Sequence, residues 1–150
     1  MIRPPRDPDF AQRVRATFAR QAFMRLIGAE LVTVAPGEVA IVLPIRAGLA
    51  QQHGYCHAGA TWAIADTASG FAAQTLMGPE DGVLTVELKI NLLAPARGER
   101  LIARGRVERA GRSLTVCRSD VVAVAGGVET PVALAVGTFM TMPGLDAAQP

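Results

Sequence analysis

The sequence has little charge, few aromatic side chains and only two cysteines. Charged residues make up 19% of the 150 residues and aromatic residues 5%, whereas half of the chain is hydrophobic. This balance excludes an intrinsically disordered chain, and the length suits one domain that folds without disulfides or a structural metal. Cys56 and Cys117 match neither a zinc-ligand spacing nor a CxxC motif, so we expect reduced thiols and no metal site.

Long apolar segments and strong net charge are also missing. No apolar run is both long enough to span a membrane and free of polar breaks, and the N-terminus lacks the apolar centre of a signal peptide. We therefore expect a cytoplasmic protein with no membrane partner.

The net charge is only +2, although 14 of the 15 basic residues are arginine. Nucleic-acid-binding domains usually combine a basic stripe with a higher net charge and aromatic platforms, so we expect no nucleic-acid partner.

One long segment is almost free of charge. Between Ala47 and Pro79 the only formally charged residue is Asp66, when histidine is counted as neutral. The same segment contains every histidine, tryptophan and tyrosine of the chain: His53, His57, Trp62 and Tyr55. This part of the sequence is therefore where we look first for chemistry.

The hydrophobic pattern predicts two helices and six strands. Apolar residues recur every four positions over 9–26, with Asp9 as a plausible N-cap and Gly28 as a stop, and residues 57–77 are long, small and Ala-rich. Turn dipeptides and β-branched runs predict strands at 29–35, 38–45, 83–93, 101–109, 113–124 and 130–141. We expect a single domain over 1–150, with loose ends at 1–8 and 143–150.

This order of elements favours an α+β fold. Antiparallel hairpins must bury one face of their sheet, and one long apolar helix can fill it. We predict a curved six-stranded antiparallel sheet wrapped around a long central helix. The helix is apolar or small on nearly every side, and one sheet cannot cover all of it, which suggests a homodimer.

Asp66 is the leading candidate for chemistry. A carboxylate within a buried, otherwise uncharged helix is costly unless it is paired or hydrogen-bonded. Asp66 could be structural, either facing a hydrated dimer interface or hydrogen-bonded to a Ser or Thr hydroxyl. Alternatively, it is a nucleophile or general base whose pKa is shifted by its surroundings.

Other polar groups surround this segment in the sequence. Ala58 and Gly59 open the helix, where unpaired N–H groups and the positive dipole end can polarise a carbonyl. His57, directly before them, either caps the helix or orients the loop. Gln51 supplies a loop amide, and Thr85 either bonds a carboxylate or water or is an ordinary strand residue. Three arginines are either ordinary solvated residues at strand ends or candidates for binding an anionic group such as phosphate: Arg97, Arg109 and Arg112.

Two stretches carry a family resemblance. The strings HGYCHAGATWAIADTASGFAA and LTVELKINLLAPARGERLIARGRV resemble the PaaI-like hotdog-fold acyl-CoA thioesterases of the phenylacetate-pathway type. That pattern has a loop Asn or Gln, His-Gly-Gly, an L-A-D-x-A helix and a strand that ends near N-L-L-x-P. Here the motif reads His57-Ala58-Gly59, so an alanine stands at the second position. The resemblance implies the hotdog fold over about 10–141.

The resemblance also implies a role for each matched residue. Asp66 falls on the catalytic carboxylate, and Ala58 on the residue whose backbone N–H polarises the thioester carbonyl. Gln51 falls on the amide that positions the water, and Thr85 on the strand hydroxyl. In this family the carboxylate and the strand hydroxyl meet across a dimer interface, so each site would use both subunits. His57, Gly59, Arg97 and Arg112 are the remaining candidates for substrate binding.

We therefore expect an acyl-CoA thioesterase that acts on an aromatic or medium-chain acyl group, with no cofactor beyond the CoA of the substrate. A homodimer or a dimer of dimers is expected. The alternative is a non-catalytic hotdog protein that holds acyl-CoA or another hydrophobic ligand, because the Ala58 methyl group could crowd the thioester. A hotdog dehydratase is the third and least favoured hypothesis.

Overall fold

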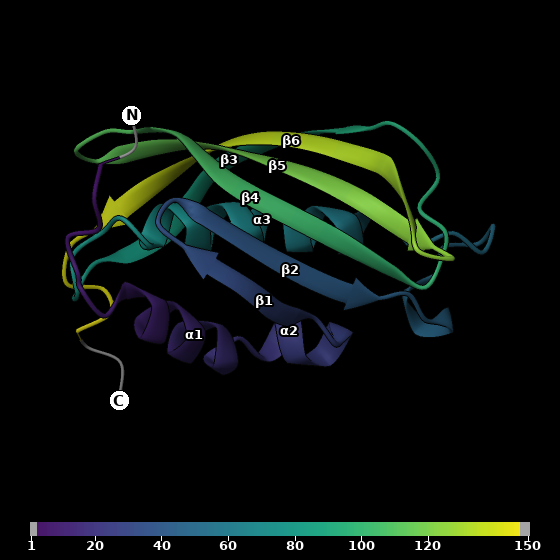
Figure 1. The fold of residues 1–150 in the computed structure, drawn as a ribbon, viewed down its shortest axis with the longest axis horizontal. Helices are drawn as coiled ribbons and strands as arrows, with labels where there is room; N and C mark the ends of the chain where they lie inside the picture. Colours follow the sequence, from purple (N-terminus) through teal and green to yellow (C-terminus); the bar gives the residue numbers. More distant parts are fainter. Residues whose placement is uncertain (1–2, 148–150) are drawn as a thin grey trace.

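One antiparallel sheet curves around one long helix. The structure is a computed structural model that describes residues 3–147 (Figure 1). Its helices are α1 (Phe10–Arg20), α2 (Ala22–Ile27) and α3 (Ala58–Gln74), with a short 3-10 turn at Ala47–Leu49. Its strands are β1 (Glu30–Ala35), β2 (Glu38–Pro44), β3 (Gly82–Leu92), β4 (Arg100–Ala110), β5 (Leu114–Ala125) and β6 (Val128–Met142).

The six strands form a single sheet in the order β1-β2-β4-β5-β6-β3, and every neighbouring pair is antiparallel. Hairpins join β1 to β2, β4 to β5 and β5 to β6, whereas β3 lies at the far edge beside β6. The α3 helix fills the concave face, and α1 packs beside β1 and α3 (Figure 1). This architecture confirms the α+β class and the hotdog fold.

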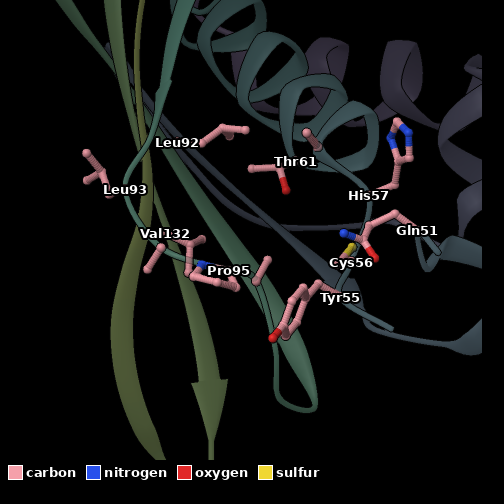
Figure 2. Close-up of a pocket in the computed structure, with 12 residues that line it drawn as sticks. Gln51, Tyr55, Cys56, His57, Thr61, Leu92, Leu93, Pro95 and Val132 are labelled. Carbon is pink, nitrogen blue, oxygen red and sulfur yellow. The ribbon is translucent and has the colours of Figure 1, made fainter. Parts of the chain in front are cut away.

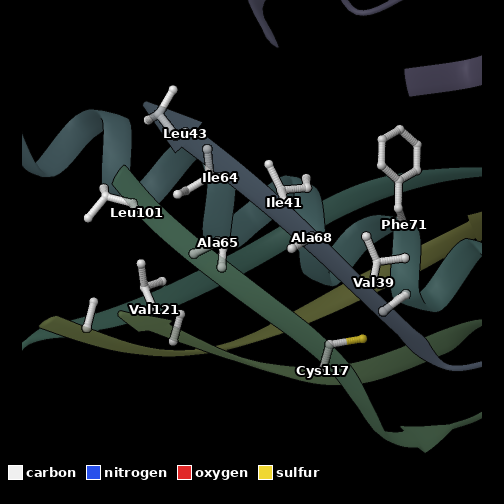
Figure 3. Close-up of a cluster of buried hydrophobic side chains, with 14 of the residues drawn as sticks. Val39, Ile41, Leu43, Ile64, Ala65, Ala68, Phe71, Leu101, Cys117 and Val121 are labelled. Carbon is white, nitrogen blue, oxygen red and sulfur yellow. The ribbon is translucent and has the colours of Figure 1, made fainter. Parts of the chain in front are cut away.

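The core lies between α3 and the inward-facing residues of the strands. Alternate residues of β4 are buried, as expected for a sheet with one covered face. At Gly105 of β4 the sheet touches the helix backbone, since an added Cβ would lie 2.4 Å from the carbonyl of Ala68. Figure 3 shows part of the resulting cluster, which includes Ile41, Leu43, Ile64, Ala68, Phe71, Leu101 and Val121.

One prediction about the helices is wrong. The helix expected over 9–26 breaks at Gln21, whose backbone is extended (φ −73°, ψ 99°) and separates α1 from α2. As expected, the sheet of one chain does not cover all sides of α3. Trp62 is 38% exposed, and Asp66, one helical turn further on the same side, is half-buried.

The described parts of the chain ends pack against the domain, contrary to the expected loose tails. Asp7 is 4% exposed and lies 2.7 Å from Arg13, and the Gln74 amide donates to Asp146. Arg13 also donates to the carbonyl groups of Gln74 and Met77, which ties the N-terminal segment to the end of α3. The outermost residues of the predicted tails, 1–2 and 148–150, lie outside the described residues.

The edge strand β3 exposes several apolar side chains and has no neighbouring strand on its outer side among the described residues. Leu84, Val86 and Leu92 are each at least half exposed, and Leu93 follows them, although Glu87 and Lys89 of the same strand are exposed as well. A long edge strand with exposed apolar residues is a template for pairing with another chain. No helix within residues 3–147 is long and apolar enough to cross a membrane.

Candidate active site

The first turn of α3 leaves one backbone N–H unpaired. His57 is the N-cap, and its Nδ1 accepts a hydrogen bond of 2.8 Å from the Gly59 N–H. The N–H groups of Ala60 and Thr61 donate to the His57 carbonyl. Among residues 3–147, the Ala58 N–H has no hydrogen-bond partner, so it is the donor available at this helix end.

The two candidate residues at the start of α3, Ala58 and Gly59, differ in what their backbone N–H groups can bind. Gly59 is a candidate for substrate binding, but its N–H already donates to His57 Nδ1. An added Cβ at Gly59 would lie 2.9 Å from His57 Nδ1, so the glycine makes room for the imidazole. Ala58 has helical backbone angles, and no non-glycine residue among those described has a positive φ. The alanine therefore holds its N–H without backbone strain.

The N-terminal end of α3, at Ala58, borders a cavity of about 470 Å³ (Figure 2). Its other side is formed mainly by the segment that follows β3. The lining residues are Gln51, Tyr55, Cys56, His57, Ala58, Thr61, Leu92, Leu93, Ala94, Pro95, Ala96 and Val132. We call this the α3 N-terminal cavity.

A tight turn holds Gln51 at the rim of this cavity. The Gln51 N–H donates to the Tyr55 carbonyl, and the Gln51 side-chain oxygen accepts from the His53 N–H. Arg97 lies over Tyr55, 4.7 Å from the ring centroid, and donates to its hydroxyl at 2.8 Å. Arg97 has no carboxylate within ion-pair distance in the described part of the chain. A cation held by Tyr55 but not neutralised by a carboxylate of the described chain thus stands beside the cavity.

Asp66 lies in a different and smaller cavity of about 80 Å³. The lining residues are Gln21, Asp66, Thr67, Gly70, Phe71, Val83 and Thr85. The Thr85 hydroxyl donates to Asp66 Oδ1 at 2.8 Å, and the second carboxylate oxygen makes no hydrogen bond within residues 3–147. Burial raises the pKa of Asp66 above its ordinary value, and the Thr85 hydrogen bond opposes this in part. We call this the Asp66 cavity.

The contact between Asp66 and Thr85 corrects one expectation. The resemblance implied that the carboxylate and the strand hydroxyl meet across a dimer interface, yet the structure joins them within one chain. The strand register shifts between Thr85 and Glu87, which marks a bulge beside the site. Bulges of this kind redirect side chains and occur often next to active sites.

Within one chain, the two candidate groups on α3 nevertheless lie far apart. Ala58 and Asp66 are eight residues apart on α3, so they are separated by about 12 Å along the helix axis. A carbonyl group bound to the Ala58 N–H is therefore beyond the reach of the Asp66 carboxylate of the same chain. The two halves of the candidate chemistry lie in two cavities.

The structure also separates the arginines. Arg97 stands at the α3 N-terminal cavity, whereas Arg112 lines a cavity of about 300 Å³ beside Met77, past the other end of α3, together with Arg3 and Arg6. Sequence reasoning did not single out Gln21 or the Tyr55–Arg97 pair. The position of Tyr55, the only tyrosine and two residues before His57, is a sequence signal that could have pointed to this pair.

Comparison with known proteins agrees with the fold. A family model described as the thioesterase superfamily matches residues 53–130. The solved structure of a thioesterase family protein from Silicibacter pomeroyi is 44% identical, covers 90% of this chain and 99% of its own, and has a TM-score of 0.88. The PaaI protein of the E. coli phenylacetic acid degradation operon is 20% identical, with 93% and 97% covered and a TM-score of 0.80, which supports the fold alone.

A curated relative agrees as well. The 1,4-dihydroxy-2-naphthoyl-CoA hydrolase of Listeria monocytogenes is 28% identical over 60% of this chain and 73% of its own length. The hotdog fold, the matched family model and the 44% identical relative agree, and this chain belongs to the thioesterase superfamily of hydrolases.

Proposed function

We propose that this protein hydrolyses acyl-CoA thioesters in a site shared by two copies of the chain. Asp66 and Thr85 of one subunit would face the Ala58 N–H of the partner subunit. The observation that carries the proposal is the Asp66 carboxylate itself. It is the only formal charge in a long apolar segment, it is held by a hydroxyl, and its pKa is raised. Such a group suits general-base or nucleophilic work.

The partner in this proposal is a second copy of the chain. Within the described residues no strand pairs with the outer edge of β3, which exposes Leu84, Val86 and Leu92, and Trp62 is exposed on the same side of α3 as Asp66. If two copies pair through this surface around a twofold axis that crosses α3 at right angles near Trp62, their α3 helices run antiparallel. Asp66 of each subunit then approaches Ala58 of the partner subunit, which removes the 12 Å separation estimated for one chain. A homodimer, or a dimer of such dimers, would carry two equivalent sites per pair.

The proposed reaction uses the side chains, the backbone and water, with no cofactor. The thioester carbonyl oxygen accepts the Ala58 N–H, which stabilises negative charge as it develops on that oxygen. Asp66 either takes a proton from the attacking water or attacks the carbonyl carbon itself. In the general-base route the carbon–sulfur bond breaks as water adds to the carbonyl carbon, and the proton that Asp66 took from the water passes to the sulfur of CoA. In the nucleophilic route the carbon–sulfur bond breaks as Asp66 forms an acyl anhydride and CoA leaves as the thiolate; water then hydrolyses the anhydride, which frees Asp66 and supplies the proton for the thiolate. Both routes give CoA as the thiol and the free carboxylic acid. Thr85 fixes one carboxylate oxygen and leaves the other for this step. Gln51 would help to position the water.

The α3 N-terminal cavity suits the CoA portion of the substrate. It is the larger of the two cavities, and Arg97 stands beside it with no carboxylate partner in the described chain. A guanidinium group is well matched to a phosphate. The CoA ester in the name of the Listeria relative supports the same class of substrate. The acyl group, aromatic or of medium length, would then extend from Asp66 in the other direction.

Non-catalytic ligand binding is the second candidate, because an alanine occupies position 58. The unstrained backbone of Ala58 and its unpaired N–H favour turnover instead.

A thiol-release assay with a panel of aromatic and aliphatic acyl-CoAs tests the proposed activity. We expect wild-type protein to release CoA, and Asp66→Asn and Asp66→Ala to lose at least 100-fold in kcat, as is typical for loss of a general base (about 10²–10⁴-fold). Asp9→Asn is the matched control, since Asp9 is exposed and its side chain makes no capping hydrogen bond. Release at the same background rate by wild type and both Asp66 variants would refute the proposal and favour the non-catalytic alternative, whereas equal release well above background would refute the role of Asp66.

A further inference from the structure

The break between α1 and α2 has no cause in the local sequence. Residues 10–27 contain neither glycine nor proline, and their apolar pattern continues through Gln21. Nevertheless the Gln21 backbone is extended, while its N–H donates to the Phe18 carbonyl and its carbonyl accepts from Arg25. Natural sequences depart from local rules mainly at functional or strained positions. The place to look for a reason is the environment of the Gln21 side chain.

Gln21 lines the Asp66 cavity. Phe18, one turn before it, packs edge-on against Phe71 of α3 with ring centroids 6.1 Å apart, which holds the end of α1 over this part of the helix. Three polar side chains from different elements, those of Gln21, Asp66 and Thr85, line this cavity together. The other lining residues are Thr67, Gly70, Phe71 and Val83.

The Gln21 carboxamide is uncommitted. Among residues 3–147, its side chain makes no hydrogen bond, although it is only partly exposed. An amide offers two donor hydrogens and one acceptor oxygen, which bond to water wherever solvent reaches them. A ligand that enters the cavity displaces that water. A ligand with a matching polar group restores the hydrogen bonds, whereas a hydrocarbon does not.

We propose that Gln21 is a specificity-determining residue that selects acyl groups with a hydrogen-bonding substituent near the thioester. This inference rests on the proposed function, because it takes Asp66 to mark the reacting carbon. The CoA portion lies toward Arg97 and the α3 N-terminal cavity, so the acyl portion enters the Asp66 cavity. There the first few carbon atoms pass Gln21, and a hydroxyl or carbonyl substituent on them meets its amide.

The size of the effect follows from the cost of an unpaired amide. Leaving a buried polar group without a partner costs about 1–3 kcal/mol, equivalent to a discrimination of about 5- to 150-fold. Because Gln21 is only partly buried and some water can remain, the lower part of this range applies. We expect a preference of about tenfold in kcat/KM for the polar member of a matched substrate pair.

The test compares butanoyl-CoA with 3-hydroxybutanoyl-CoA and 4-hydroxybutanoyl-CoA. Wild-type protein should prefer at least one hydroxylated ester by about tenfold. Gln21→Met has similar length but no amide, so it should lose that preference, and Gln21→Asn should retain part of it. Gln12→Met, on the exposed face of α1, is the matched control and should keep the wild-type ratio. A purely structural role for Gln21 would lower the rates with all esters together and leave their ratio unchanged.

A binding measurement distinguishes failure of this inference from failure of the proposed hydrolysis. The affinities of the same three esters are measured by calorimetry for the Asp66→Asn protein and for the Asp66→Asn, Gln21→Met double variant. If wild type releases no CoA but the Gln21-dependent preference in affinity persists, the hydrolase proposal fails and the role of Gln21 stands. Equal ratios with and without the Gln21 amide, in both turnover and binding, would overturn the inference.

Discussion

Replacing Ala58 with proline removes one atom group that the proposed mechanism requires. Proline lacks the backbone N–H, and Ala58 is the first residue of α3, the helical position that accepts proline best. The residue before a proline must be extended, and His57 already is, with φ −61° and ψ 138°. The Ala58 N–H bonds to nothing within residues 3–147, so the fold loses no hydrogen bond. We therefore expect Ala58→Pro to fold normally.

The expected effect on catalysis is large. Loss of a single oxyanion-hole donor typically lowers kcat by about 10²–10³-fold. We expect Ala58→Pro to show this loss in the thiol-release assay, with a thermal unfolding midpoint close to that of wild type. Ala58→Gly keeps the N–H and should retain most of the activity. If Ala58→Pro folds like wild type and keeps kcat within about threefold, the assignment of this N–H to the carbonyl oxygen is refuted.

Three further predictions concern charge and packing. Because the pKa of Asp66 is raised, kcat/KM should fall with decreasing pH at a pKa above the ordinary 3.8. The free energy of unfolding, measured by urea melts, should decrease as pH rises from 3.8 to the raised pKa, because the folded state then holds a proton that the unfolded state has lost. The Asp66→Asn protein should not show that decrease. Gly105→Ala should destabilise the protein by about 1–3 kcal/mol or more, since the new methyl group would overlap the Ala68 carbonyl; Gly70→Ala is the control, as its methyl would lie 3.5 Å from Phe139. Arg97→Ala should raise KM for an acyl-CoA by about tenfold but leave KM for the N-acetylcysteamine thioester, which has no phosphate, nearly unchanged. The outcomes that would contradict these predictions are a pH profile that follows an ordinary aspartate, a neutral Gly105→Ala and equal KM changes for both thioesters.

The elements of the fold could be predicted because their signals are local. Turn residues at Pro36 and Gly37 separate two β-branched runs, and the structure has the β1–β2 hairpin there. The long Ala-rich segment forms α3, and the backbone of Gly105 on β4 approaches Ala68 of this helix closely. The break at Gln21 could not be predicted, because residues 10–27 contain no glycine or proline that would signal it.

The candidate site was only partly accessible from sequence. Asp66 stood out because an isolated charge in an apolar segment has an energetic cost that sequence alone reveals. The sequence did not reveal which side chains contact one another in the folded chain. Thr85 lies 19 positions from Asp66, and only the path of β3 beside α3 shows that the two residues bond within one chain. Likewise, Arg97 and Arg112 have similar sequence surroundings, but strand geometry places them at separate cavities.

The central claim is that Asp66 of one subunit works with Ala58 of the partner subunit, and mixing two inactive variants tests it most directly. Asp66→Asn and Ala58→Pro proteins are each assayed alone, then dissociated together in denaturant, refolded at equal concentrations and assayed again. In a mixed dimer, one of the two sites has both defects and the other has none, so random mixing should restore about one quarter of the wild-type activity per subunit. If the refolded mixture contains mixed dimers, shown by native mass spectrometry, and is still no more active than the separate variants, the shared site is contradicted.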